Sequence, residues 1–365
     1  MKIMFLTNIP APYTIDFFEL IGKKCELTVV FERSRAKDRE NSWLKQEYKN
    51  FKGIFLRGLS VSNDMAFCPQ VIGQLRKESD MYILGNYSSP TGILALLFLK
   101  SKRIPFAIHA DGGIINFDEN KFKRKIKKFL ISSASIYFSS GEETSKYLKF
   151  YGADKKKIIK YPFTSVWKKE ILDALPDKTY YRERLQIKER RVVVSIGQMI
   201  PRKGFDVLLQ AVQIINTDDI GYYLIGGDPY QELKEFVECN RLNNVHFISF
   251  LNREKIMEYL KAADIFVLLT REDIWGLVIN EACAMGLPII STDTCIAATE
   301  MVENGENGYI VRNEDASTAA EKMKYLLENP ELCKKMGQES LKVANVYSLE
   351  NMSEVYYQNI EKVIR

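Results

Sequence analysis

The chain has little of what metal centres, disulfide frameworks and membrane spans require. It has only two histidines, and its six cysteines show no CxxC pair or other metal-ligand spacing. We therefore expect reduced thiols in a cytosolic protein, and no metal site. The longest apolar run, residues 93–99, is far shorter than the roughly 20 residues that a spanning helix needs. The apolar stretch at the N-terminus is too short for a signal peptide, so no segment is expected to cross a membrane.

Length and charge indicate two domains with different partners. A chain of 365 residues exceeds one core of ordinary size, and 46% apolar residues argue against disorder. We place the N-terminal domain over residues 1–165, a second domain over 166–348, and a last helix over 349–365 that packs back on the first domain. Residues 1–165 carry 28 basic and 16 acidic side chains, whereas the remainder carries 24 and 31. This asymmetry predicts an anionic partner for the first domain alone.

Short apolar runs alternate with amphipathic helical patterns along both halves. Strands are predicted at Lys2–Thr7, Glu26–Phe31 and Arg191–Ile196, each followed by a loop and a helix. This alternation predicts an α/β fold with doubly wound parallel sheets. No GxGxxG follows the first strand, which argues against a nicotinamide or flavin enzyme.

The stretch from Thr270 to Pro288 organises the second domain. An apolar run just before Thr270 predicts a strand buried on both faces, and helix formers after Gly276 predict a helix that stops at a Gly-Leu-Pro sequence. Asp273 then lies in the loop at the carboxyl end of a strand, and Glu281 lies in the helix. Ligands bind at such strand ends, and the free amides of a helix start can hold a phosphate.

The spacing in this stretch resembles the signature of the retaining glycosyltransferases of family four. An acid, an aromatic residue two positions later, Gly, a second acid eight positions after the first, and a following Gly-x-Pro carry the resemblance. It implies the GT-B fold of two facing Rossmann-like domains. By position it also implies that Asp273 lies by the transferred sugar, that the backbone of Gly276, Leu277 and Val278 binds the donor phosphates, and that Glu281 holds the ribose. The family usually has Glu at position 273, and aspartate is one methylene shorter.

The stretch from Gly197 to Gly204 resembles the family's first loop of the nucleotide domain. There, an Arg and a Lys neutralise the donor diphosphate. Lys203 matches the Lys, Gln198 stands at the usual Arg position, and Arg202 adds a neighbouring cation. The strand predicted at residues 245–250 leads to the family's seat for the base, which would be Phe250 and Leu251.

One residue of the N-terminal domain is implied beside the donor sugar. A strand predicted at residues 106–109 precedes Asp111 and two glycines, where the family has a His or an Asp. His109 and Asp111 are both candidates, and a structural histidine is about as frequent at such a place.

The strongest run of charge is the segment of residues 121–130. On a helix, Phe122, Ile126, Phe129 and Leu130 gather on one face. The other faces carry six cations, which are Lys121, Lys123, Arg124, Lys125, Lys127 and Lys128. This pattern favours binding to an anionic membrane surface. The alternative is a solvated helix that packs through its apolar stripe.

Together these features predict a retaining, metal-independent glycosyltransferase. Asp273 and Lys203, with His109 or Asp111, are the predicted catalytic residues, and Gln198, Arg202, Lys203, Phe250, Leu251, Gly276, Leu277, Val278 and Glu281 the predicted donor-binding residues. We expect a nucleotide diphosphate sugar, UDP favoured over GDP, and no other cofactor. The acceptor is expected to be a lipid-linked oligosaccharide in capsule, O-antigen or exopolysaccharide synthesis, and no nucleic acid is expected to bind. The enzyme would lie in the cytoplasm, peripherally at the inner face of the cell membrane.

Two other classes remain open on the sequence alone. The departures at Asp273 and Gln198 also suit a non-catalytic nucleotide-sugar-binding subunit. A two-domain dehydrogenase or epimerase is the weaker alternative.

Overall fold

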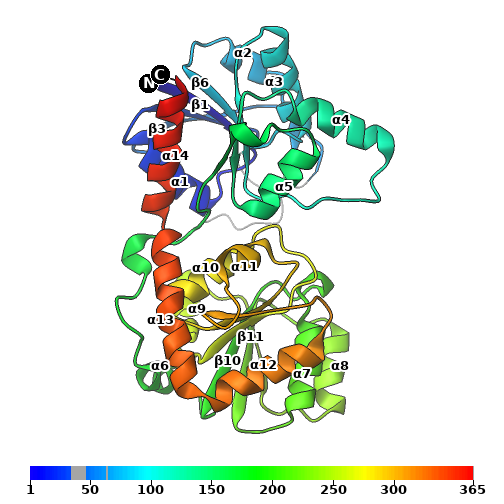
Figure 1. Ribbon diagram of the computed structural model, residues 1–365, viewed down its shortest axis with the longest axis vertical. Helices are drawn as coiled ribbons and strands as arrows, with labels where there is room; N and C mark the ends of the chain where they lie inside the picture. Colours follow the sequence, from blue (N-terminus) through cyan, green and yellow to red (C-terminus); the bar gives the residue numbers. More distant parts are fainter. Residues whose placement is uncertain (34–46, 63–64, 365) are drawn as a thin grey trace. The chain divides into compact units, whose positions relative to one another are not determined.

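The computed structural model describes residues 1–33, 47–62 and 65–364 of the chain. These residues form two compact units: unit 1 comprises Met1–Ser165 and Leu349–Arg365, and unit 2 comprises Val166–Ser348 (Figure 1). Arg365, the last residue of the predicted C-terminal helix, lies outside the described residues. In the described ranges, no helix combines the length and the apolar character needed to span a bilayer.

Unit 1 is a parallel sheet with helices on both faces. Its strands pair in the order β3-β2-β1-β6-β7-β8-β9, and β4 and β5 form a separate antiparallel pair. The strands are β1 (Lys2–Thr7), β2 (Glu26–Phe31), β3 (Phe51–Phe55), β4 (Leu59–Ser60), β5 (Ala66–Phe67), β6 (Met81–Leu84), β7 (Ala107–Ala110), β8 (Ile136–Ser139) and β9 (Ile158–Lys160). The helices are α1 (Pro12–Gly22), α2 (Val71–Leu75), α3 (Pro90–Ser101), α4 (Lys121–Ile131), α5 (Glu142–Phe150) and α14 (Leu349–Ile364), with a 3₁₀ turn at Lys155–Lys157.

The C-terminal helix α14 completes unit 1, as predicted. It packs on α1 (Figure 1) and buries Tyr356 between the sheet and neighbouring aromatic rings. The Tyr356 ring stacks on Phe138 with ring centroids 3.9 Å apart and meets the edge of Phe17 at 5.1 Å. A buried aromatic ring contributes more apolar area than other side chains, so this helix is part of the core.

Unit 2 is a second parallel sheet, with strands in the order β12-β11-β10-β13-β14-β15. The strands are β10 (Arg191–Ile196), β11 (Ile220–Ile225), β12 (Val245–Ile248), β13 (Ile265–Leu268), β14 (Ile289–Thr292) and β15 (Gly308–Val311). The helices are α6 (Lys178–Leu185), α7 (Phe205–Ile215), α8 (Gln231–Cys239), α9 (Arg253–Ala262), α10 (Leu277–Ala284), α11 (Ile296–Met301), α12 (Ala316–Glu328) and α13 (Pro330–Val346), with 3₁₀ turns at Lys168–Glu170 and Pro201–Lys203.

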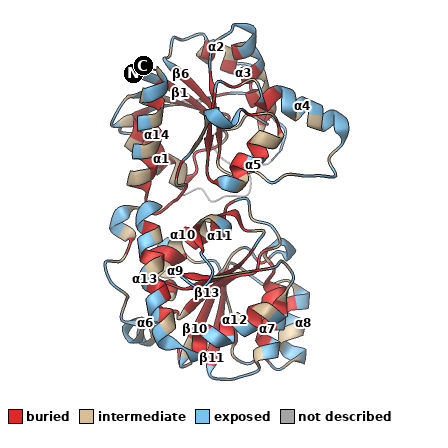
Figure 2. Cartoon of the chain, in the orientation of Figure 1, coloured by how far each residue is buried: buried red, intermediate tan, exposed pale blue. Residues whose placement is uncertain are grey.

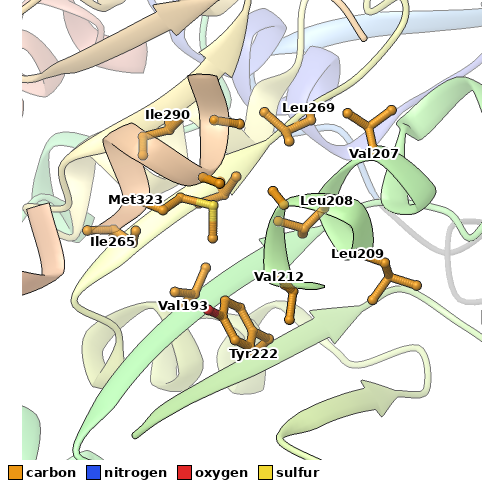
Figure 3. Close-up of a cluster of buried hydrophobic side chains, with 14 of the residues drawn as sticks. Val193, Val207, Leu208, Leu209, Val212, Tyr222, Ile265, Leu269, Ile290 and Met323 are labelled. Atoms are coloured by element: carbon orange, nitrogen blue, oxygen red, sulfur yellow. The ribbon is translucent and has the colours of Figure 1, made fainter. Parts of the chain in front are cut away.

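The core of unit 2 forms because its central strands are apolar on both faces. Val193 of β10 and Ile265 of β13 pair across the sheet and are buried. On one face they pack with Leu208 of α7 and Met323 of α12, as Figure 3 shows. Burying a side chain of this size stabilises the fold by about 1.5–3 kcal/mol. Figure 2 shows the result, with both sheets buried and the outer helix faces exposed. The predicted α/β class is therefore confirmed.

Candidate functional site

The strand order of unit 2 reverses between β10 and β13. From β10 the chain runs outward through β11 to β12, then returns to place β13 on the other side of β10. In open parallel sheets, ligands bind outside the carboxyl ends of the strands at such a switch point. The two loops that leave β10 and β13 are the ones that the sequence motifs mark.

These two loops touch at Gly204. Gly204 has φ +65° and precedes α7, and a Cβ at this position would lie 1.9 Å from the carbonyl oxygen of Leu269. Glycine is required here because any side chain would push the two loops apart.

Arg271 connects the same two loops through hydrogen bonds of its side chain and of its backbone. Its guanidinium donates two hydrogen bonds to Asp206 of α7, at 2.8 and 2.6 Å, and also pairs with Glu314. Its backbone N–H donates to the carbonyl of Arg202 at 2.8 Å. Burial alone would raise the pKa of Asp206, but the bonds from Arg271 outweigh it and lower that pKa. The start of the loop after β13 is therefore fixed to the end of the loop after β10.

Lys203 and Asp273 meet where the loops come together. The Lys203 ammonium donates to Asp273 Oδ2, and each side chain is 13% exposed. Asp273 is held by its backbone as well, since its N–H donates to the carbonyl of Thr294 at 3.0 Å and its carbonyl accepts from Ile296 N–H at 3.2 Å. A cation and a carboxylate predicted as separate site residues thus occupy one point of the structure.

The start of α10 lies three residues beyond Asp273. Gly276 has φ +97° and precedes the helix without a side chain that caps it. A Cβ on Gly276 would lie 2.9 Å from the buried Cys295 thiol, so the backbone here comes closer than any other residue allows. The amides of Leu277 and Val278 open the helix, where anions bind favourably.

Glu281 lies one turn further along α10. Its side chain is 14% exposed, and its Oε1 lies 3.1 Å from Arg253 Nη1 at the start of α9. Burial raises the pKa of Glu281, while the charge of Arg253 opposes this rise and that of Glu170 adds to it. The predicted ribose carboxylate is therefore held by a neighbouring cation.

The remaining predicted donor residues surround these groups more loosely. Gln198 is exposed, and Arg202 is exposed while its Nη1 donates to the carbonyl of Glu272 at 2.7 Å. The predicted strand at residues 245–250 is too long, because β12 ends at Ile248 and leaves Phe250 and Leu251 in a loop. Phe250 is 74% exposed, as a side chain available for stacking would be.

His109 lies in the aromatic core of unit 1, at the end of β7. Its Nδ1 is 3.1 Å from the Tyr356 hydroxyl, its Nε2 is 3.3 Å from the Tyr161 hydroxyl, and its ring stacks on Tyr161. Burial lowers the pKa of His109 to about 3, so the ring is neutral near pH 7. Both of its nitrogens have partners from unit 1 itself.

Asp111 follows two residues later and is half-buried. Burial raises the pKa of Asp111, and a bond from its own backbone N–H opposes the rise. The backbone of the nearby Gly113 lies close to the Tyr147 ring, since a Cβ on Gly113 would lie 2.7 Å from that ring.

Helix α4 exposes three of the four residues of its apolar stripe and buries the fourth, Leu130. Phe122 is 71% exposed, Phe129 51% and Ile126 42%, while Leu130 and Ile131 are buried. Figure 2 shows that most of α4 is exposed. The alternative prediction, a helix packed through this stripe, therefore holds only at its C-terminal end, where Leu130 is buried against the rest of unit 1.

Two cations of α4, Arg124 and Lys127, have partners elsewhere in unit 1. Arg124 Nη2 donates to the carbonyl of Phe117 at 2.8 Å, and Lys127 forms a 2.6 Å ion pair with Glu119. The Tyr151 hydroxyl also donates to Glu119 at 2.7 Å. The other four cations of the helix, Lys121, Lys123, Lys125 and Lys128, are exposed around the apolar stripe.

Two arginines of the site were missed by sequence reasoning. Arg271 lies inside the organising stretch, and a cation at the start of a ligand loop could have marked it. Arg253 comes two residues after the predicted base position Leu251, but only the fold brings it to Glu281. No cluster of three side chains suited to hold a metal ion occurs within residues 1–33, 47–62 and 65–364.

Comparisons with known proteins bear on the fold and on the class of protein. Residues 177–343 match the family described as Glycosyl transferases group 1. The chain is 25% identical over 270 residues to an uncharacterized glycosyltransferase of Haemophilus influenzae, covering 70% of this chain and 76% of that protein. It is 21% identical over 306 residues to the N,N'-diacetylbacillosaminyl-diphospho-undecaprenol alpha-1,3-N-acetylgalactosaminyltransferase of Campylobacter jejuni, covering 80% of each. Among solved structures, Anabaena HepE in complex with UDP and glucose matches with a TM-score of 0.76 and 17% identity, over 100% of this chain and 99% of that one.

The fold is therefore GT-B, with a Rossmann-like sheet in each unit. The chain carries a Glycosyl transferases group 1 domain over residues 177–343, and it is a glycosyltransferase of this fold.

Proposed function

We propose that this glycosyltransferase moves a sugar, with retention of configuration, from a nucleoside diphosphate to an acceptor hydroxyl. The observation that carries the proposal is the meeting of Lys203 with Asp273 beside the start of α10, at the switch point of unit 2. A cation, helix amides and a carboxylate at one point suit a leaving diphosphate next to a reacting sugar.

The charge of the leaving group decides the chemistry. The transition state of glycosyl transfer has oxocarbenium character, and a departing diphosphate needs charge stabilisation more than protonation. Lys203, Arg202 and the amides of Leu277 and Val278 would supply this stabilisation from protein groups. Asp273 would hold the Lys203 ammonium in place before the donor arrives and then face the sugar.

The rest of the donor would extend along α10 and the loop after β12. Glu281 would accept hydrogen bonds from the ribose hydroxyls, and Phe250 and Leu251 would flank the base. Gln198 would contact the diphosphate through its side-chain amide, as an uncharged hydrogen-bond donor. We propose a UDP donor, in line with the complex of HepE with UDP and glucose.

For the residue of unit 1 that acts beside the sugar, we propose Asp111. His109 already has a tyrosine hydroxyl at each ring nitrogen, whereas Asp111 is half-buried and follows the end of β7. His109 would then orient Tyr161 and Tyr356 within unit 1. Turnover that survives Asp111→Asn but not His109→Gln, with both variants folded, would reverse this choice.

We further propose a lipid-linked acceptor in polysaccharide assembly, reached from the cytoplasmic membrane surface. The Campylobacter relative is named for a diphospho-undecaprenol substrate. Exposed Phe122, Ile126 and Phe129, flanked by exposed lysines, give α4 the apolar and cationic character of a helix that lies in an anionic lipid surface.

The test begins with nucleotide binding. A thermal-shift panel of UDP, GDP and ADP on the whole protein should show stabilisation by UDP, about 2.7 kcal/mol at 100 times its dissociation constant. Glu281→Gln should remove most of that stabilisation, whereas Lys234→Gln, an exposed lysine on α8, should leave it unchanged. Stabilisation by none of the three nucleotides would refute the proposed function.

Turnover then separates the enzyme from a binding subunit. Glu281→Gln should mainly raise the donor KM, because ribose contacts do not change in the reaction, and Asp273→Asn should mainly lower kcat. Wild-type protein that binds UDP but releases no UDP from UDP-sugars with lipid extracts as acceptor would instead be a non-catalytic nucleotide-sugar-binding subunit.

A further inference from the structure

Arg253 lies between two carboxylates that come from distant parts of unit 2. Its Nη1 is 3.1 Å from Glu281 Oε1, and its Nη2 donates to Glu170 Oε2 at 3.1 Å. The same oxygen of Glu170 accepts the backbone N–H of Trp167 at 2.8 Å. The three charged side chains therefore form a line of alternating sign that ends on Glu281.

The backbone positions of Arg253 and Glu170 are both fixed by local structure. Arg253 is the first residue of α9, and the side chain of Asn252 caps that helix by accepting the N–H of Lys255 at 2.9 Å. Glu170 ends the 3₁₀ turn Lys168–Glu170. Because an arginine fork donates in two fixed directions, it can bind both carboxylates only in one orientation.

The charge state of Glu281 matters for a ribose contact. An ionised carboxylate accepts hydrogen bonds at both oxygens, whereas a protonated one has a hydrogen on one of them. Burial raises the pKa of Glu281, Arg253 from α9 opposes the rise, and Glu170 from the 3₁₀ turn adds to it. Within the described part of unit 2, these are the charged groups that act on Glu281.

Resting on the proposed function, we propose that Arg253 is a positioning residue of the donor site. It keeps Glu281 charged and correctly oriented for the ribose hydroxyls, and Glu170 holds Arg253 in place. Arg253 itself touches neither the sugar nor the phosphates in this arrangement, so it acts on donor binding through Glu281.

The opposite charges of Arg253 and Glu170 predict pH effects of opposite sign on Glu281. Nucleotide affinity is full above the pKa of Glu281 and falls as the pH drops through it. Arg253→Gln removes the charge that holds this pKa down, so the fall begins at a higher pH. Glu170→Gln keeps a side-chain oxygen that can accept from Arg253 but removes a negative charge that raises the pKa of Glu281, so the fall begins at a lower pH. General loss of structure would not move the two variants in opposite directions.

Titration calorimetry tests this with UDP, GDP and ADP on the whole protein, using the nucleotide that wild type binds most tightly. From about pH 8 to about pH 5, Arg253→Gln should lose roughly tenfold more affinity than wild type at the acid end. Arg253→Lys should restore the wild-type pH profile, because it restores the charge, but only part of the affinity at neutral pH. The donor KM should rise in Arg253→Gln with little change in kcat.

Lys255→Gln is the matched control, since it removes one charge from the same helix at a residue paired with Glu258. If wild type binds a nucleotide and Glu281→Gln weakens binding, but Arg253→Gln keeps the wild-type profile, the inference is wrong and the proposed function stands. If wild type binds none of the three nucleotides, both fall. Arg253 is 42% exposed, so we expect its variants to fold. If Arg253→Gln does not fold, the pH dependence of nucleotide affinity in Glu170→Gln is the test. A fall in affinity that begins at a lower pH than in wild type supports the inference, and one that begins at the same or a higher pH overturns it.

Discussion

The exposed apolar stripe of α4 predicts a membrane affinity whose size follows from its exposure. Phe122 is 71% exposed and Phe129 51%. A phenylalanine offers about 200 Å², so the two rings present roughly 250 Å². At about 25 cal/mol per Å², complete burial would be worth about 6 kcal/mol. Because a helix at the lipid surface buries its apolar face only in part, about half of this, roughly 3 kcal/mol, is the expected contribution.

The paired substitution Phe122→Ser and Phe129→Ser should therefore weaken vesicle binding by about a hundredfold. Changing the exposed Lys121, Lys123, Lys125 and Lys128 to Gln removes up to about 1 kcal/mol for each charge at low salt, and this loss should vanish as salt is added. The apolar loss should persist at high salt. The two variants thus separate the two contributions.

Co-sedimentation with vesicles measures both, using phosphatidylcholine alone and phosphatidylcholine mixed with phosphatidylglycerol. The matched control is Lys155, Lys156 and Lys157 to Gln, which removes exposed charges from a 3₁₀ turn of the same unit. Wild-type protein should sediment with the anionic vesicles, and the control should behave like wild type. Equal sedimentation of wild type and the phenylalanine variant would refute the reasoning and leave α4 as a solvated helix.

Three further predictions concern the loops of unit 2. Lys203→Ala should lower donor turnover by roughly a hundredfold or more, because it removes the cation beside the leaving phosphate, while Lys234→Ala should not; a stable, fully active Lys203→Ala protein would contradict the assignment. Gln198→Arg should tighten UDP binding, measured by calorimetry, without abolishing activity, and unchanged affinity would place this side chain away from the diphosphate. Gly276→Ala should lower the free energy of unfolding by about 1–3 kcal/mol in urea denaturation. Gly227→Ala is its control, since φ is +123° there but no atom lies within 4 Å of the added Cβ. An equal loss of unfolding free energy in both variants would show that contact with Cys295 contributes nothing to the effect at Gly276.

Local rules in the sequence could predict much of unit 2. The run that forms β13 is apolar throughout, and that of β10 has three consecutive valines at its centre. Gly276 separates a loop from a helix by its own conformational freedom. Asp273 and Glu281 could therefore be assigned to a loop and a helix. The ion pair of Asp273 with Lys203 joins residues 70 positions apart, and it follows only from β10 and β13 being neighbours in the sheet.

Other features could not be predicted because tertiary contacts decide them. The amphipathic pattern of α4 shows which residues share a face, but not which face meets the domain. Buried Leu130 and the Lys127–Glu119 pair decide that, and they leave Phe122, Ile126 and Phe129 exposed. In the same way, the sequence identifies His109 as a rare residue at a strand end, whereas its partner Tyr356 lies 247 positions away.

The place of α14 has a consequence for the order of folding. Unit 2 is one continuous segment, so all of its strands and helices are present once residue 348 has been synthesised. Unit 1 lacks Tyr356, and with it the ring that stacks on Phe138 and bonds to His109, until the last helix has been made. Domains usually fold as units during synthesis, the N-terminal one first. Here the half of the chain that is made first completes its core last, so a chain that ends at residue 348 would lose stability in unit 1 and keep it in unit 2.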